Sequence, residues 1–244
     1  MKFKILCKYG KYPAADGGTS SFFLAGRERA NVVIDMGSGA LTALEKNKIP
    51  LEKIDAIVLS HLHFDHMSDV LALVYKSEIY RKEGRINRKI PLYLPETPED
   101  VFRLVKDADA FDLRVVTDGM SVETGSVTLT FFKMKHPVET YAVKCFEDGK
   151  SLSYTADTVY NDNIEKALAG SSAVFADACV LERDFNEKSP HISVREIARL
   201  TKKSGAKIVL IHLPPEGGHK EILDEALAEN ENSELGNENI WYEI

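Results

Sequence analysis

The chain has few cysteines, and they are poorly placed for cross-linking. Cys7, Cys145 and Cys179 are odd in number, far apart and in no Cys-x-x-Cys pair. This pattern weighs against a disulfide framework and favours reduced thiols, hence a cytosolic protein.

Long hydrophobic runs are also missing. No stretch approaches the length of a membrane span, and the apolar run after Met1 is too short for a signal peptide. The 244 residues are 44% hydrophobic and 28% charged, which is typical of a soluble globular protein. Because no linker, repeat or low-complexity segment divides the chain, we expect a single domain over residues 1–244, cytoplasmic and not bound to a membrane.

The chain also lacks an excess of positive charge. The formal net charge is −7, whereas proteins that grip long nucleic acids usually carry a basic balance or stripe. The stretch Lys76–Lys89 is the basic exception. We favour a solvated helix end, whose cations complement the helix dipole, over an RNA contact. Its cations are Lys76, Arg81, Lys82, Arg85, Arg88 and Lys89.

Histidine is concentrated in one place. Three of the seven histidines lie beside an aspartate, directly after an apolar run typical of a buried strand. His61 and His63 point the same way in an extended segment and can bind one ion. Asp65 and His66 follow as the chain turns into a helix and can face a second ion. Imidazole and carboxylate groups are suitable ligands for zinc and similar divalent metal ions. The alternative interpretation is a polar loop that contains histidines by chance.

The hydrophobic pattern predicts an α/β fold in two halves, each with strands first and strand–helix alternation after. Strands are expected at 3–7, 22–25, 32–34, 56–59, 91–94, 113–116, 120–123, 127–135, 141–146, 152–155, 173–177, 207–212 and 240–243. Helices are expected at 41–47, 68–82, 161–169, 194–204 and 219–229. A further helix is expected to begin at Thr97-Pro98, with a cap residue and a proline in the first turn. Such an order indicates two packed sheets with helices outside.

Three further candidate ligands follow predicted strands: His136, Asp157 and His212. Strand ends are where open α/β folds place their chemistry. Each residue alone would more often be a satisfied polar group at a strand end.

The stretch His61-Leu62-His63-Phe64-Asp65-His66 resembles the His-x-His-x-Asp-His signature of the metallo-β-lactamase superfamily. His136, Asp157 and His212 match its third histidine, bridging carboxylate and last histidine in order. The resemblance implies a four-layer αββα sandwich, a homodimer and two divalent metal ions. Zinc is the metal expected first, with manganese and iron as alternatives.

The resemblance also implies a role for each residue. One metal takes His61, His63 and His136; the other takes Asp65, His66 and His212; Asp157 bridges them. Asp35 would orient a ligand, with simple turn capping as its alternative role. The metals would hold a hydroxide between them, and Asp65 would help to orient it for attack.

His191 indicates which subgroup of the superfamily the chain resembles. It precedes a capping box, Ser193 to Glu196, and a histidine there is commonly just a loop residue. His191-Ile192-Ser193 nevertheless resembles the His-x-Ser/Thr element of ribonuclease Z-like proteins, whose histidine protonates the leaving oxygen. Asp177 occupies the place of the acidic residue that supports it. The remaining His219 is expected in solvent.

Departures from the ribonuclease Z pattern weigh against tRNA. The interval between His136 and Asp157 leaves no room for the long tRNA-binding arm, and no Pro-x-Lys-Arg loop is present. Asp177 is shorter than the usual glutamate, and Ala156 replaces the usual glycine. We therefore expect hydrolysis of small phosphodiesters, such as nucleotides and cyclic nucleotides. The alternatives are tRNA 3′-processing, acyl hydrolysis of a lactone, thioester or lactam, and an iron-loaded redox scaffold.

Overall fold

Two seven-stranded sheets form the centre of the computed structural model, which describes residues 1–238 and 240–244. The first sheet has the order β14-β1-β2-β3-β4-β5-β6 and the second the order β13-β12-β11-β10-β9-β8-β7. The first sheet comprises β1 Lys2–Cys7, β2 Ser21–Ala25, β3 Asn31–Met36, β4 Ala56–Val58, β5 Ile90–Leu94, β6 Phe111–Val115 and β14 Tyr242–Glu243. The second comprises β7 Ser121–Thr124, β8 Val127–Lys133, β9 Tyr141–Glu147, β10 Lys150–Tyr154, β11 Ala173–Asp177, β12 Lys207–Ile211 and β13 Ser233–Leu235.

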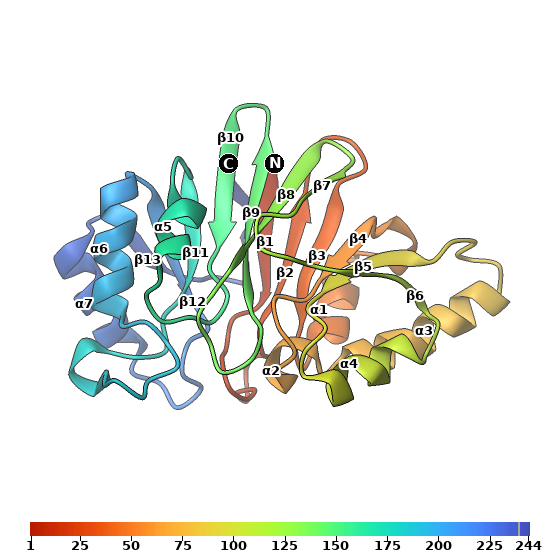
Figure 1. Ribbon diagram of the computed structural model, residues 1–244, viewed down its shortest axis with the longest axis horizontal. Coiled ribbons are helices and arrows are strands. Elements are labelled where there is room, and N and C mark those ends of the chain that lie inside the picture. The colour runs from red at the N-terminus through yellow and green to blue at the C-terminus, as the bar shows by residue number, and fades with distance from the viewer. Residues whose placement is uncertain (239) are drawn as a thin grey trace.

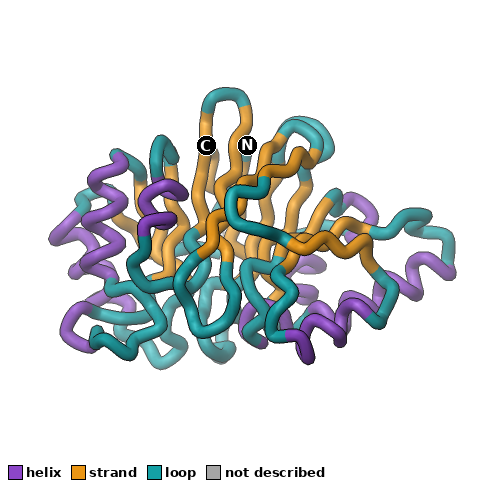
Figure 2. Tube along the Cα trace, in the orientation of Figure 1, coloured by secondary structure: helices purple, strands orange, loops and turns teal. Residues whose placement is uncertain are grey.

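Helices flank the pair of sheets on both outer sides (Figures 1 and 2). Along the first sheet lie α1 Ala40–Lys46, α2 Phe64–Met67, α3 Val70–Lys82, α4 Glu99–Lys106 and the 3-10 turn η1 Leu51–Lys53. Along the second lie α5 Asp162–Leu168, α6 Val194–Ser204, α7 His219–Glu229 and the 3-10 turn η2 Glu182–Asp184. The layer order is therefore αββα, and the predicted fold class is confirmed.

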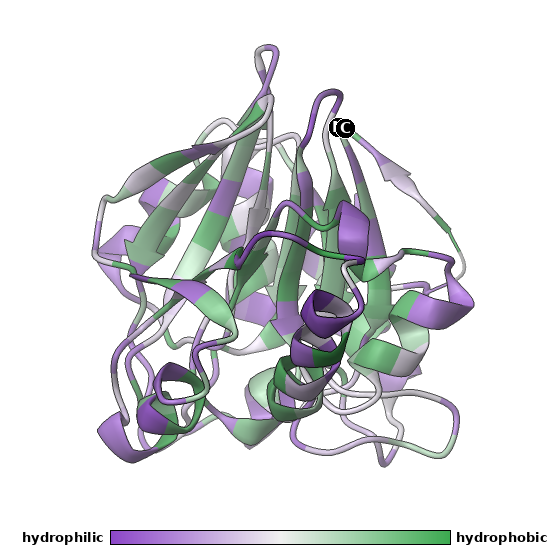
Figure 3. Cartoon of the chain, turned by 90° about the vertical axis from the view of Figure 1, so that its right-hand side faces the viewer, coloured by the Kyte–Doolittle hydropathy of each residue, from purple (hydrophilic) through white to green (hydrophobic). Residues whose placement is uncertain are grey.

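Three hydrophobic clusters hold these layers together. Phe3, Phe22 and Phe175 belong to the cluster between the sheets, where residues of both inner faces meet. Two further clusters pack the helices onto the outer faces of the first and second sheets. Because the parallel strands β4, β11 and β12 are covered on both faces, their sequences are nearly continuous apolar runs. Figure 3 shows this hydrophobic colouring along the strands of both sheets.

Strand direction brings the chemistry to one edge. Neighbouring strands run parallel from β3 to β6 and from β10 to β13. The carboxyl ends of β3, β4, β10, β11 and β12 meet at the lower edge in Figure 1, near α2. Parallel sheets of α/β proteins place binding sites at such ends.

The interval between His136 and Asp157 is filled by β9 and β10, as predicted. Asp148 and Gly149 form the turn with φ angles of 51° and 78°, the left-handed values that a tight two-residue hairpin requires. The hairpin leaves no room for a longer arm between these two residues.

Some predicted boundaries were wrong. The helix expected at 68–82 is present as α3, which begins two residues later at Val70, and the separate short helix α2 before it was not predicted. The expected cap at Thr97 is absent, because Pro98 is the N-cap residue of α4 and has no side-chain hydrogen bond to offer. The strand β13, parallel to β12, was not predicted.

Within the described residues, no helix is long and apolar enough to cross a bilayer. Cys7, Cys145 and Cys179 are all buried and unpaired.

Candidate metal centre

The histidine-rich loop is short because a buried strand feeds directly into a helix. β4 ends at Val58, and His63 is already the N-cap residue of α2, with extended backbone. The extended stretch between them lets His61 and His63 point the same way. His61 Nε2 lies 3.1 Å from His63 Nδ1, so the two ring nitrogens converge on one place.

A first cluster forms around this pair. His136 follows β8, and its Nε2 lies 3.2 Å from His63 Nδ1. Asp157 follows β10, and its Oδ2 lies 3.8 Å from His61 Nε2 and 3.9 Å from His136 Nε2. One ligand atom from each of the four residues lies within 4.8 Å of the others. Three imidazoles and a carboxylate are a donor set typical of zinc and similar divalent ions.

A second cluster lies against the first and shares Asp157 with it. Its members are Asp65, His66, Asp157 and His212. His212 Nε2 is 3.2 Å from Asp65 Oδ2 and 3.4 Å from Asp157 Oδ2. Asp157 Oδ1 is 3.5 Å from His66 Nε2. The seven predicted ligands are therefore together in the structure, with Asp157 between the two clusters.

Two buried atoms show that a cation fits here. His66 Nε2 and Asp157 Oδ1 are buried and lack a hydrogen-bond partner among the described residues. His66 Nδ1 faces Asp35 Oδ2 at 2.8 Å, so a proton on Nδ1 leaves the lone pair of Nε2 free. A nitrogen lone pair facing a carboxylate oxygen, both removed from water, is an arrangement that a metal ion would satisfy.

Burial sets the charge of the first cluster. Burial lowers the pKa of His61, His63 and His136 from the ordinary histidine value. Their rings are therefore neutral near pH 7, the form that binds metals. Burial also lowers the pKa of His66, but the charges of Asp157 and Asp35 outweigh it and raise that pKa to about 10. A metal ion at His66 Nε2 would therefore take the place of the proton that the two carboxylates otherwise hold there.

Asp35 organises the groups behind His66. It is fully buried and accepts hydrogen bonds from Ser60 N at 2.7 Å, Ser60 Oγ at 2.8 Å and Tyr154 OH at 2.7 Å. Together with His66 Nδ1, these groups surround both carboxylate oxygens. Asp35 is therefore placed to fix the orientation of the His66 ring.

Replacement of Asp35 with alanine should weaken both stability and metal binding. Buried donors from Ser60 and Tyr154 would lose their acceptor, which should cost about 2–5 kcal/mol of unfolding free energy. Metal affinity should fall about 10- to 100-fold, the usual effect of removing a partner of a ligating histidine. Denaturant unfolding and metal titration measure the two effects. Asp112→Ala is the control, since Asp112 forms an exposed ion pair with Arg114 and should change neither.

His191 stands beside both clusters. Its Nδ1 lies 2.6 Å from Asp177 Oδ2, and its ring centroid is 5.5 Å from that of His136 and 5.3 Å from that of His212. Burial lowers the pKa of His191, but the charge and hydrogen bond of Asp177 outweigh it and raise that pKa to about 11. The predicted pairing of His191 with Asp177 is thus present.

Asp177, Cys179, His191 and His212 form a third group of close donors. Here the polar atoms already engage one another, because Asp177 Oδ1 lies 3.3 Å from His212 Nδ1 and accepts from Cys179 N at 3.2 Å. A hydrogen-bond network that positions His191 and His212 accounts for this group without an ion.

The chain matches the family model described as the beta-lactamase superfamily domain over residues 30–213. It belongs to the beta-lactamase superfamily. The predicted recognition is confirmed, and the matched range contains all seven candidate ligands.

Three relatives illustrate the range of the superfamily. The probable metallo-hydrolase YhfI of Bacillus subtilis is 27% identical, over 93% of this chain and 92% of that protein. The crystal structure of YhfI superposes with a TM-score of 0.91 at 25% identity, covering 99% and 98% of the two chains. A diphosphatase of the PhnP family has a TM-score of 0.79 at 20% identity, covering 100% and 97%. Ribonuclease Z of Sulfolobus acidocaldarius is 20% identical, over 77% and 80% of the two chains.

Three residues of this superfamily member adopt left-handed backbone at the site. Asp35, Ala156 and His212 have φ angles of 58°, 52° and 55°, which side-chain-bearing residues seldom adopt. Each lies where a strand gives way to a site loop. The value at Ala156 explains why glycine is usual there, and such local strain is characteristic of functional sites.

Several supporting residues escaped the sequence analysis. Ser60 and Tyr154 bind Asp35, and Lys11 N donates to Asp65 Oδ2 at 2.8 Å. His219 was expected in solvent but is half-buried, with its Nε2 2.7 Å from Pro214 O. The sequence carries no local signal for the contacts of Ser60, Tyr154 and Lys11, since they join segments far apart along the chain.

Gly10 is another such residue, because its backbone lies directly against His212. A Cβ atom at Gly10 would come within 2.5 Å of the His212 ring. Gly10 N also donates to Leu213 O at 3.0 Å, which fixes the two segments side by side.

Gly10→Ala should therefore displace the His212 ring and weaken binding of the ion that this ring faces. We expect roughly a 10- to 100-fold loss of affinity for one metal of two, measured by metal titration. Gly119→Ala is a matched control. Gly119 has φ of 75°, and a Cβ atom there would have nothing within 4 Å, so this change should lower stability and leave metal binding intact. Unchanged metal binding in Gly10→Ala would show that the ring can move aside.

Proposed function

We propose that the chain is a metal-dependent hydrolase of small phosphodiesters, with nucleotides, cyclic nucleotides included, as substrates. The observation that carries the proposal is the His191–Asp177 pair, held 2.6 Å apart at the side of the metal centre. A proton donor at this place serves a poor leaving group such as an alkoxide.

In this proposal each side chain of the site has its own role. His61, His63 and His136 would hold one metal ion, Asp65, His66 and His212 the other, and Asp157 both. Two bound ions, most readily zinc, would lower the pKa of a water and neutralise charge on the phosphoryl oxygens. Asp65, whose Oδ2 is held by Lys11 N, would help to orient that water. Asp177 occupies Nδ1 of His191, so Nε2 is the atom that carries the proton to the departing oxygen.

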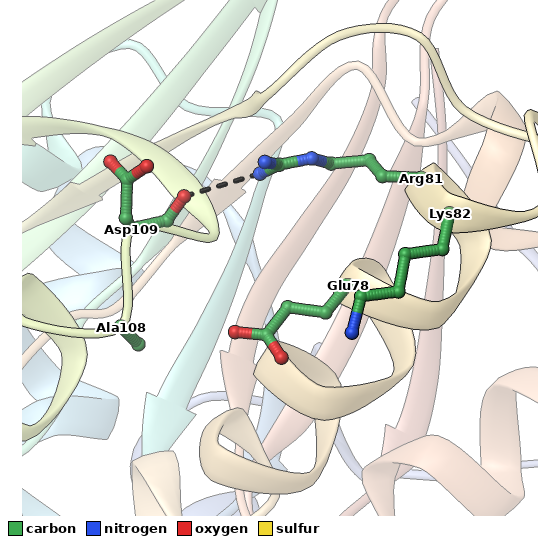
Figure 4. A pocket seen from close by; sticks show the side chains of 5 residues that line it. All are labelled: Glu78, Arg81, Lys82, Ala108 and Asp109. Atoms are coloured by element: carbon green, nitrogen blue, oxygen red, sulfur yellow. Dashed lines mark hydrogen bonds between the residues drawn. The ribbon is translucent and has the colours of Figure 1, made fainter.

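The basic stretch Lys76–Lys89 gives little support to an RNA substrate. Four of its cations pair with carboxylates: Lys76 with Glu45, Arg85 with Glu52, Arg88 with Asp55 and Lys89 with Asp109. Arg81 donates to the Asp109 carbonyl at 3.2 Å, as Figure 4 shows. Charges already paired within the protein have less to gain from phosphates.

The position of Lys76–Lys89 also gives little support to an RNA substrate. This stretch covers the C-terminal half of α3 and the segment after it, and the 13 residues of α3 span about 20 Å at 1.5 Å per residue. A cavity of about 590 Å³ beside Glu78, Arg81 and Lys82 belongs to the C-terminal end of α3. The metal centre lies at the opposite end of α3, next to α2 (Figure 1).

Two of the three similar proteins have names that agree with phosphorus chemistry. One is described as a diphosphatase and another as ribonuclease Z, and both names denote cleavage at phosphate groups. The homodimer implied by the resemblance remains a prediction, which light scattering of the purified protein would test.

A substrate panel tests the proposal. Metal-loaded protein should cleave bis(nitrophenyl) phosphate and cyclic nucleotides much faster than precursor tRNA, a thioester or a lactam, measured side by side at physiological salt. The metal pair and the proton donor supply the chemistry, and the net charge of −7 disfavours a large polyanion.

Two results would contradict it. Efficient, site-specific cleavage of precursor tRNA, weakened by neutralising Arg85 and Arg88, would establish the RNA alternative. Activity confined to thioesters or lactones would show that His191 does not serve a phosphate leaving group. Elemental analysis of the same samples identifies the metal; iron with an absorption band would favour the redox alternative over colourless zinc.

A further inference from the structure

We propose that a cavity beside His136 binds the nucleobase of the substrate, so that nucleotides are preferred over other small phosphodiesters. This inference rests on the proposed phosphodiesterase function and names the part of the substrate that this function leaves open.

The cavity adjoins the metal centre through one shared residue, His136. It has a volume of about 590 Å³, and the candidate ligand His136 forms part of its wall. Pockets of roughly 300–1,000 Å³ accommodate small ligands and cofactors. A phosphate held at the metals would therefore have space beside it for the group that it carries.

Hydrogen bonds between its walls form the cavity in advance. The three walls are the segment after β8, the segment after β10, and the loop before α6 together with the first turn of α6. Val159 N donates to Lys135 O at 3.0 Å, which joins the first two. His136 Nδ1 lies 3.0 Å from Pro190 O, which joins the first to the third. Little ordering would be needed when a ligand enters, and preformed sites bind more tightly for that reason.

Two aromatic side chains on these walls remain open to a ligand. Tyr160 is 41% exposed and Phe185 is 37% exposed, and both line the cavity. Tyr160 OH donates to Glu165 Oε1 at 3.1 Å, which anchors the ring to α5. Exposed aromatic rings beside a phosphate-binding centre are the means by which proteins stack bases without reading their sequence.

Charged groups make the cavity unsuited to a lipid chain. Lys135, Lys188, Glu187 and Glu196 line it together with the two rings. An alkyl chain would gain nothing from these groups and would desolvate them at a cost. A nucleoside, with a flat aromatic base and polar edges, matches the mixture of rings and charges.

The test compares two ligands that differ only in the base. Binding of AMP and of ribose 5-phosphate to the metal-loaded protein is measured by calorimetry. AMP should bind about 5- to 150-fold more tightly, the range expected for one stacked base. Tyr160→Ala and Phe185→Ala should each reduce this ratio at least about 5-fold, whereas Tyr160→Phe, which keeps a ring, should preserve most of it.

Phe146→Ala is the matched control. Phe146 is a 47% exposed aromatic residue on β9, beside the hairpin at the opposite end of the molecule in Figure 1. Its removal should leave the ratio at the wild-type value.

Several outcomes would overturn the inference. Equal affinity of the wild-type protein for AMP and ribose 5-phosphate would by itself overturn the inference. Octyl phosphate binding as tightly as AMP would assign the cavity to an apolar chain. Cleavage of bis(nitrophenyl) phosphate without preferential binding of AMP would refute the base-binding cavity and leave the proposed function intact. A preference for AMP without any phosphodiester cleavage would support the cavity and remove the proposed function.

Discussion

Asp157→Ala is expected to purify with at most one metal ion per chain and without measurable hydrolase activity. Asp157 is the one residue that belongs to both ligand clusters, so its loss would leave two cations facing each other with no anion between them. Elemental analysis gives the metal content, and thermal unfolding with and without a chelator gives the stabilisation by metal. That stabilisation should be smaller than in the wild-type protein, since fewer ions bind the folded state.

Asp162→Ala controls for the loss of a carboxylate from the same region of the chain. Asp162 is exposed in the first turn of α5, and its variant should keep the wild-type metal content and activity. Full occupancy of both sites in Asp157→Ala would eliminate the bridging role.

His191→Ala should keep both metals and lose turnover by about 10²–10⁴-fold, the usual effect of removing a general acid. The loss should be largest for alkoxide leaving groups. It should shrink for nitrophenolate, which departs with little need for a proton. Rates for a cyclic nucleotide and for bis(nitrophenyl) phosphate, measured on the same metal-loaded sample, give this comparison.

His219→Ala is the control histidine. His219 lies outside the described donor clusters and contacts Pro214 O, so its removal should leave the leaving-group dependence unchanged. Departure of metal from His191→Ala would instead identify His191 as a ligand and exclude the proton-donor role.

The ligand positions could be predicted because each lies where a recognisable strand ends. β4 and β12 are short apolar runs, and the polar residues that follow them are conspicuous. Parallel strands then bring such residues to one edge of the sheet whatever the details of packing. The pairing of His191 with Asp177 was predicted from resemblance alone, since the two residues are far apart in the sequence.

Contacts between layers could not be predicted in this way. Tyr154 reaches Asp35 from the other sheet, and Gly10 meets His212 through the pairing of two loops. Both contacts depend on how the sheets approach each other, which the periodicity of one segment does not encode.

Short or interrupted elements were missed for different reasons. β13 is three residues long and half-buried throughout, so it lacks the apolar alternation of a strand. The break between α2 and α3 coincides with Asp69, whose carboxylate accepts from Leu41 N at 2.9 Å. That tertiary hydrogen bond, rather than any helix-breaking residue, lies at the gap between the two helices.

The sharing of ligands between the two halves of the chain has a consequence for the life of the protein in the cell. His61 and His63 come from the first sheet, while His136 and Asp157 come from the second. An ion bound by all four would act as a cross-link that holds the halves in register. Metal-starved cells should therefore contain a protein whose halves separate more readily, and proteases act on such open forms. The abundance of this chain would then follow the supply of its metal, with no dedicated sensor.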